Sequence, residues 1–184
     1  MLSTKLILEN IGQSVVDQLK NDIKTKSLVI GHSDPPNASG ALYDSIRYEA
    51  TEDSLKVYAK DYIYYLVHGR GETKKGQGGI LKPIIRKWID DKGIQPPTTY
   101  VAKWRLKSGQ LMTRDRKYKS EAIAKDSLAY MITRSIHAKG TLIYQQGGSD
   151  LLSSILTESF IQNVKDELIF NTVNAIKSEI LAIA

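Results

Sequence analysis

The side chains able to perform chemistry are few in this sequence, and their spacing gives little support to catalysis. The three histidines lack a second histidine or an acid at the spacing of a metal site; they are His32, His68 and His137. Adjacent acids occur at 52–53, 90–91 and 166–167, where they suit a turn or an exposed helix flank. The chain has no cysteine, which excludes disulfides, thiolate metal ligands and cysteine nucleophiles.

Phosphate-loop and serine-nucleophile motifs are also incomplete. A phosphate-binding loop places Lys and then Ser or Thr directly after the second of two glycines that enclose four residues. Gly71 and Gly76 have this spacing, but Gln77 follows them. The serines between positions 33 and 45 lack the glycine-flanked turn that exposes a nucleophile in hydrolases. We therefore expect no catalytic residue, no cofactor and no metal, and an enzyme for phosphate-bearing substrates is the weakest alternative.

Positive charge is concentrated in the middle third of the chain. Residues 69–139 hold 17 Lys and Arg against 6 Asp and Glu, a net charge of +11, whereas the remainder carries −5 and the whole chain +6. Such a block serves a nucleic acid, an acidic protein partner, or only a solvated face. Trp104, between two cations, suits a base platform or an interface anchor. The candidate partner-facing or DNA-facing residues are Arg70, Lys74, Lys75, Lys103, Trp104, Arg105, Arg114, Arg116, Lys117 and Lys119.

The composition is that of an ordinary globular chain. Its 184 residues predict a single domain over 1–184. Hydrophobic residues make up 41% and charged residues 25%, both close to globular averages. No apolar stretch approaches the ~20 residues that cross a bilayer. Positions 1–20 contain acidic and polar residues throughout, whereas a signal peptide has a continuous apolar segment. We expect the chain to be made in the cytoplasm, without a membrane partner.

The hydrophobic pattern predicts an α+β fold, in which a small antiparallel β-sheet packs against α-helices joined by long flexible loops. Two-residue alternation over 46–51 and 54–60 predicts a β-hairpin. The segment 80–119 is interpreted as a basic insertion or arm, and after residue 94 we expect a loop with a short extended stretch near 101–104. The expected helices cover 4–26, 61–69, 82–91, 120–138 and 157–181, with helical turns near Leu42 and a short helix over 151–156.

Apolar residues should form one face of the helix over 120–138, with small alanines as additional contacts. The predicted face consists of Ile123, Leu128, Met131, Ile132 and Ile136.

Three segments occur in a distinctive order. They are a box of small residues with Gly, Leu and Ser-Ile over 37–48, an aromatic stretch ending in glycines over 62–71, and a helix over 127–141. With an N-terminal helix before the box and a hairpin and Gly-rich loop at their expected places, the chain resembles the neck and tail-completion proteins of tailed bacteriophages. It departs from them at Val67 and His68, where many relatives have an acid, and in the long segment 80–119.

The resemblance implies a structural virion protein of the neck without catalysis. It implies a homo-oligomeric ring that is hexameric or dodecameric in the virion. For the isolated protein it also allows a monomer. The ring would join portal or adaptor and tail proteins and surround the channel for genomic DNA, using two different faces of each subunit. Loops over 31–38, 69–79 and 94–119 would order on assembly. The alternative is a basic nucleic-acid-binding protein that uses residues 103–119.

Overall fold

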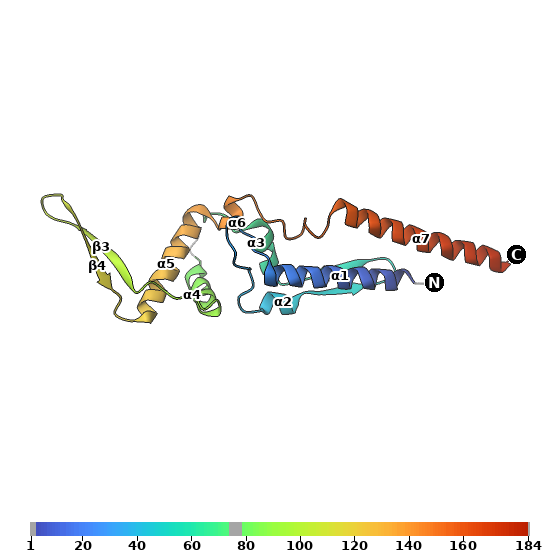
Figure 1. Cartoon of the computed structure of the whole chain (residues 1–184), viewed down its shortest axis with the longest axis horizontal. Coiled ribbons are helices and arrows are strands. Elements are labelled where there is room, and N and C mark those ends of the chain that lie inside the picture. The colour runs from blue at the N-terminus through green and yellow to red at the C-terminus, as the bar shows by residue number, and fades with distance from the viewer. Residues whose placement is uncertain (1–2, 74–78, 184) are drawn as a thin grey trace. The chain divides into compact units, whose positions relative to one another are not determined.

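A computed structural model describes residues 3–73 and 79–183, and for Trp104 and residues 179–183 it describes the backbone alone. The fold is α+β, as predicted, and the described residues contain two small two-stranded antiparallel sheets (Figure 1). The chain divides into two compact units. One, here called the body, comprises Met1–Arg70 and Leu142–Ala184; the other, called the inserted unit, is Gly71–Thr141.

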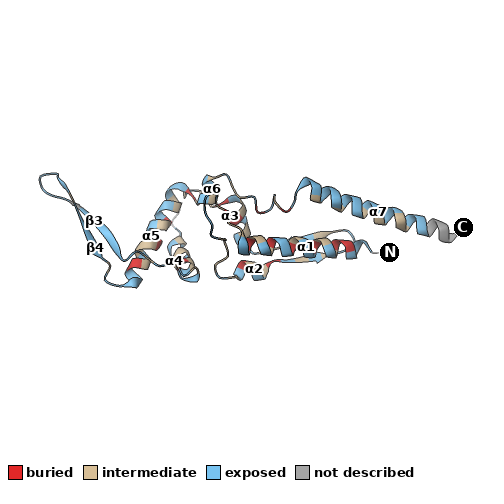
Figure 2. Cartoon of the chain, in the orientation of Figure 1, coloured by how far each residue is buried: buried red, intermediate tan, exposed pale blue. Residues whose placement is uncertain are grey.

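Helix α1 (Thr4–Thr25) is the long N-terminal helix of the body, and its sequence accounts for its start and its buried face. Ser3 is the N-cap, because its hydroxyl accepts a hydrogen bond from the amide of Leu6 at 3.2 Å. The buried residues recur every three or four positions and so share one face; they are Ile7, Leu8, Gly12, Val16, Leu19 and Ile23. Figure 2 shows this buried stripe along α1.

The predicted β-hairpin of the body packs against α1. Strands β1 (Arg47–Ala50) and β2 (Leu55–Tyr58) pair antiparallel, with Glu49 opposite Lys56. A Cβ atom added to Gly12 would lie 2.6 Å from Cδ2 of Tyr48 and 2.7 Å from Cδ1 of Leu55. Glycine at position 12 therefore lets the helix approach the hairpin closely.

Of the short helices of the body, α3 (Tyr62–His68) and α6 (Leu142–Gln145) are in contact, and they meet at the end of α3. Helix α2 (Ala41–Ser45) precedes β1, and α3 ends at Gly69, as predicted. Gly69 has a φ of 73°, and a Cβ atom there would overlap the backbone of Tyr144 in α6. Ser149 caps the same end of α3, because its amide donates to the Val67 carbonyl at 2.7 Å and its hydroxyl to the Leu66 carbonyl at 2.6 Å. Position 69 thus leaves no room for a side chain.

The segment that leads into the last helix belongs to the core of the body. Residues 151–156 form turns instead of the short helix expected there. So short a stretch does not nucleate a helix by itself, and burial of Leu151 and Ile155 sets its path. Helix α7 (Glu158–Ile183) follows, and the Thr157 hydroxyl accepts a hydrogen bond from the amide of Phe160 at 3.1 Å. The core cluster comprises Val16, Leu19, Ile23, Leu28, Leu42, Ile46, Leu66, Leu151 and Ile155.

In the inserted unit, α4 (Leu81–Asp91) packs against α5 (Glu121–Lys139). The predicted apolar face of α5 is partly wrong, because Ile123 and Met131 are about half exposed. The fully buried positions of α5 are instead Ala124, Ala129 and Thr133. Helix α4 has 11 residues and α5 has 19, so α4 covers only part of the surface of α5 and two of the larger apolar residues stay about half exposed.

The second hairpin corrects the expectation for residues 94–119. Strands β3 (Thr99–Arg105) and β4 (Leu111–Lys117) pair antiparallel along their whole length, from Thr99 opposite Lys117 to Arg105 opposite Leu111. The short extended stretch expected near 101–104 is therefore one part of a seven-residue strand.

Candidate functional site

The second hairpin carries most of the predicted site, and we call residues 99–119 the basic arm. Strand β3 is rich in residues that favour β-structure, such as Thr, Tyr and Val. Between the two strands, Gly109 has a φ of 82° in a tight loop closed by hydrogen bonds from Leu106 to Gln110 and from Gly109 to Leu106, both 2.9 Å long. A three-residue loop that ends with glycine in this conformation is a common hairpin connection.

Both faces of the basic arm are open to solvent. Every side chain described in it is exposed except those of Ala102, Met112 and Tyr118, which are partly buried (Figure 2). Tyr118 anchors the base of the arm, since its hydroxyl donates to the Ser127 hydroxyl on α5 at 2.9 Å. The Tyr118 ring also contacts the Tyr100 ring, with centroids 4.8 Å apart. An isolated two-stranded hairpin is only marginally stable in water, so the arm is better suited to contacting a partner than to building a core.

The charge of the arm is strongly one-sided. It holds seven Lys and Arg against one acid, Asp115, a net charge of +6. Residues directly opposite in an antiparallel pair share a face, so the register places Arg114 and Arg116 on one face and Lys103 and Lys117 on the other. Cations therefore line both faces of the arm.

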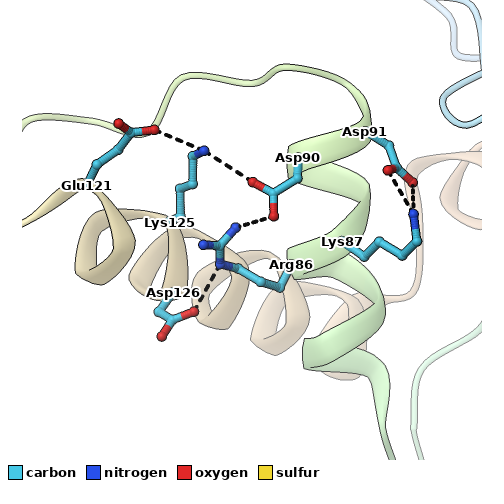
Figure 3. Close-up of polar contacts among 7 residues, drawn as sticks. All are labelled: Arg86, Lys87, Asp90, Asp91, Glu121, Lys125 and Asp126. Atoms are coloured by element: carbon cyan, nitrogen blue, oxygen red, sulfur yellow. Dashed lines mark hydrogen bonds and ion pairs between the residues drawn. The ribbon is translucent and has the colours of Figure 1, made fainter.

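Unlike the arm, the two helices of the inserted unit hold cations that pair with acids on the same two helices, as Figure 3 shows. Arg86 on α4 pairs with Asp90 at 2.6 Å and with Asp126 on α5 at 3.1 Å. Lys125 on α5 pairs with Glu121 at 2.9 Å and with Asp90 at 3.1 Å. Lys87 likewise pairs with Asp91 at 2.7 Å, so all four acids on α4 and α5 have a basic partner on these two helices.

These contacts shift the pKa values of the groups involved. Hydrogen bonds from Arg86 and then Lys125 lower the pKa of the Asp90 carboxyl below its usual value. Hydrogen bonds to Glu121 and Asp90 raise the pKa of Lys125, and the bond to Asp90 is the main cause of a raised pKa for Arg86. Arg86, Asp90 and Lys125 are therefore held in their charged forms at neutral pH.

The cations of the arm have no comparable partners. Within residues 3–73 and 79–183, none of them lies within ion-pair distance of an acid; they are Lys103, Arg105, Lys107, Arg114, Arg116, Lys117 and Lys119. Unpaired cations on an exposed ribbon form a surface ready to accept anions.

The structure places the predicted site residues in different surroundings. The basic arm brings together Lys103, Arg105, Arg114, Arg116, Lys117 and Lys119. Arg70 is half-buried and is the last residue of the body before the inserted unit begins, and Trp104 lies on β3 opposite Met112. Lys74 and Lys75 fall outside the described residues. The predicted site omitted Lys107, which lies beside the Ser108–Gly109 turn at the tip of the hairpin; the Ser-Gly dipeptide is the sequence signal that could have placed it there.

The body has a second candidate surface, an apolar groove between α1, β2 and α7. The groove has a volume of about 380 Å³, and its lining includes Leu8, Ile11, Leu55, Val57, Phe160 and Val164. Further along α7, Ile169, Val173 and Ile176 recur at helical spacing and are exposed. Phe170 beside them is 68% exposed. Large exposed apolar residues gathered on one helix are typical of a protein–protein contact.

Comparisons with protein-family models, with curated proteins and with solved structures found no match to this chain. Among the described residues, no group of three or more His, Cys, Asp or Glu side chains is arranged to hold a metal ion. The helices in that part of the chain are also too short or too polar to span a membrane. Two surfaces of the described residues are candidates for function: the basic arm and the apolar surface of the body.

Proposed function

We propose that this chain is a structural subunit of the neck of a tailed bacteriophage, forming a ring that joins the portal or its adaptor to the tail. In the assembled particle the ring surrounds the DNA channel, and the subunit performs no catalysis. The proposal rests first on the three ordered segments that resemble neck and tail-completion proteins.

The places of these segments in the fold support the proposal. The box over 37–48 supplies α2 and the first residues of β1, and two of its apolar side chains, Leu42 and Ile46, are buried in the core. The aromatic stretch forms α3, which ends at the sterically required Gly69. These segments therefore supply buried residues and a sterically required glycine. Such positions are the ones that proteins with a shared fold are expected to have in common.

The exposed apolar face of α7 is the observation that carries an assembly function. Ile169, Phe170, Val173 and Ile176 lie in water in the single chain, at a cost of about 25 cal/mol per Å² of apolar surface. A ring covers such a face with a different surface of the next copy. The apolar groove beside α1 supplies a second, different face on the same unit.

The test combines location with assembly. Electron microscopy of the virion should place the chain at the portal–tail junction, and the double variant Ile169→Ser with Phe170→Ser should yield particles without joined tails. Its matched control is Asp166→Ser with Lys177→Ser, which changes exposed polar residues on the same helix and leaves the net charge unaltered.

Sedimentation of the purified chain mixed with its portal complex measures the same step in vitro. The control should co-sediment as a ring, and the apolar double variant should remain free. Normal tailing by the apolar variant, or a location away from the neck, would refute the proposed function.

A further inference from the structure

We propose that the basic arm binds the phosphate backbone of double-stranded DNA without sequence preference. This activity goes beyond the proposed neck function and depends on the charge and geometry of the arm alone. An acidic protein is the competing partner, and the contacts below favour a duplex.

The first argument is the separation of charge within the inserted unit. Acids on α4 and α5 pair with Arg86, Lys87 and Lys125, and none of them neutralises the arm. The arm keeps a net charge of +6, equal to that of the whole chain. Cations free of partners release the counterions condensed on DNA when they bind phosphates, which is the main source of sequence-independent affinity.

The second argument is the repeat distance along the strands. Alternate residues of an antiparallel strand are about 6.8 Å apart, as are Lys103 and Arg105 on β3 or Arg114 and Arg116 on β4. Each strand of B-DNA advances about 3.4 Å per phosphate, so this spacing equals about two nucleotide steps. A two-stranded ribbon also fits the major groove, which is about 12 Å wide.

The third argument separates a duplex from a single strand. Proteins that hold single strands stack bases on free aromatic faces. The two described aromatic side chains of the arm are Tyr100 and Tyr118, whose rings contact each other, and Tyr118 is also tied to α5 through Ser127. They brace the arm, so among the side chains described there the cations are the groups left to bind a partner.

The experiment measures binding of the full chain to a short fluorescent DNA duplex of arbitrary sequence, by anisotropy over a series of salt concentrations. The arm variant replaces Arg105, Arg114, Arg116 and Lys117 by Gln. Its control replaces Lys24, Lys56, Lys60 and Lys177 by Gln; these are exposed cations of the body, so both variants have the same net charge.

We expect the wild type and the control to bind with a steep salt dependence. The arm variant should bind far more weakly, and the slope of log K against log salt should fall in magnitude by about 3 to 4, since each lost phosphate contact contributes about 0.9. An equal loss in both variants would mean that only net charge matters and would overturn the proposal. So would tighter binding to poly-glutamate or to single-stranded DNA than to the duplex.

A measurement on the wild type makes the test independent of how the variants fold. In a titration with the duplex, amide NMR signals of residues 99–119 should shift first and most. Shifts confined to the body would overturn the proposal. The sedimentation assay with the portal complex separates this inference from the neck function, because the arm variant should still form rings if only DNA binding is lost.

Discussion

Gly12 lies in the middle of α1, where glycine weakens a helix by about 1 kcal/mol relative to alanine. Replacing a glycine in the middle of a helix by alanine would therefore stabilise most helices. Here the added Cβ atom would lie 2.8 Å from Cγ of Tyr48, at the inner end of the ring, so the side chain cannot avoid it by turning its tip away. The hairpin limits the room for a side chain at position 12, and the sequence of the helix alone does not indicate this limit.

Gly12→Ala should accordingly destabilise the body by about 1–2 kcal/mol, because overpacking of this kind costs about 1–3 kcal/mol and exceeds the gain in helix propensity. Urea denaturation followed by circular dichroism measures the change. Asn10→Ala is the control, since it raises helix propensity at an exposed position of α1 and should leave stability equal or slightly higher. A Gly12→Ala protein as stable as that control would contradict the close packing.

At the scale of the element, sequence patterns predict those elements that bury one face. The stripe of α1 is visible because one side of the helix is buried, and the alternation in β1 is visible because every second residue is partly buried. The basic arm buries neither face, so β3 and β4 show no alternation of apolar and polar residues, and only the Ser108–Gly109 turn marks the hairpin.

The buried face of α5 escaped prediction for a different reason. Hydrophobicity selects Ile123 and Met131, but the buried residues of α5 are Ala124, Ala129 and Thr133. Which face of a helix is buried depends on the size and approach of its neighbour, and that is not encoded within the helix. The sequence alone shows which residues of the site are cations. That these cations lie apart from the acids of α4 and α5 is seen only in the folded structure.

The ion pairs between α4 and α5 predict a dependence of stability on acid. Because the pKa of Asp90 is lower in the folded chain, the stabilisation is present above the unfolded pKa of about 3.9 and is lost as pH falls through the folded value. Melting of the inserted unit, followed by circular dichroism between about pH 6 and about pH 2, should therefore move to lower temperature on the acid side.

Asp90→Asn should reduce this acid dependence and lower the melting temperature at neutral pH, because Arg86 and Lys125 lose a shared partner. Glu49→Gln is a suitable control, as it removes an exposed acid of the body whose nearest basic group, on Arg47, is 4.0 Å away. An unchanged acid response in the Asp90 variant would show that the network contributes nothing measurable, as many exposed ion pairs do.

At the scale of the whole molecule, the two units divide both charge and stabilising contacts. The body carries a net charge of −4 and the inserted unit +10. The large apolar cluster lies entirely in the body, whereas the buried apolar side chains of the inserted unit are those of Ile89, Ala124 and Ala129 among the described residues. One unit thus has a substantial core, and the other depends on a single helix–helix contact with its ion pairs.

This division predicts two unfolding transitions in differential scanning calorimetry, with the inserted unit melting first because so little apolar surface is buried there. Gly12→Ala should lower only the second transition and Asp90→Asn only the first. Hydrogen exchange of the amides in α1 and α5 identifies which unit each transition belongs to. A single transition shifted by both variants would mean that the units unfold as one cooperative structure. In that case the basic arm would gain its stability from the core of the body, and charge substitutions on the arm would have to be judged against the stability of the whole chain.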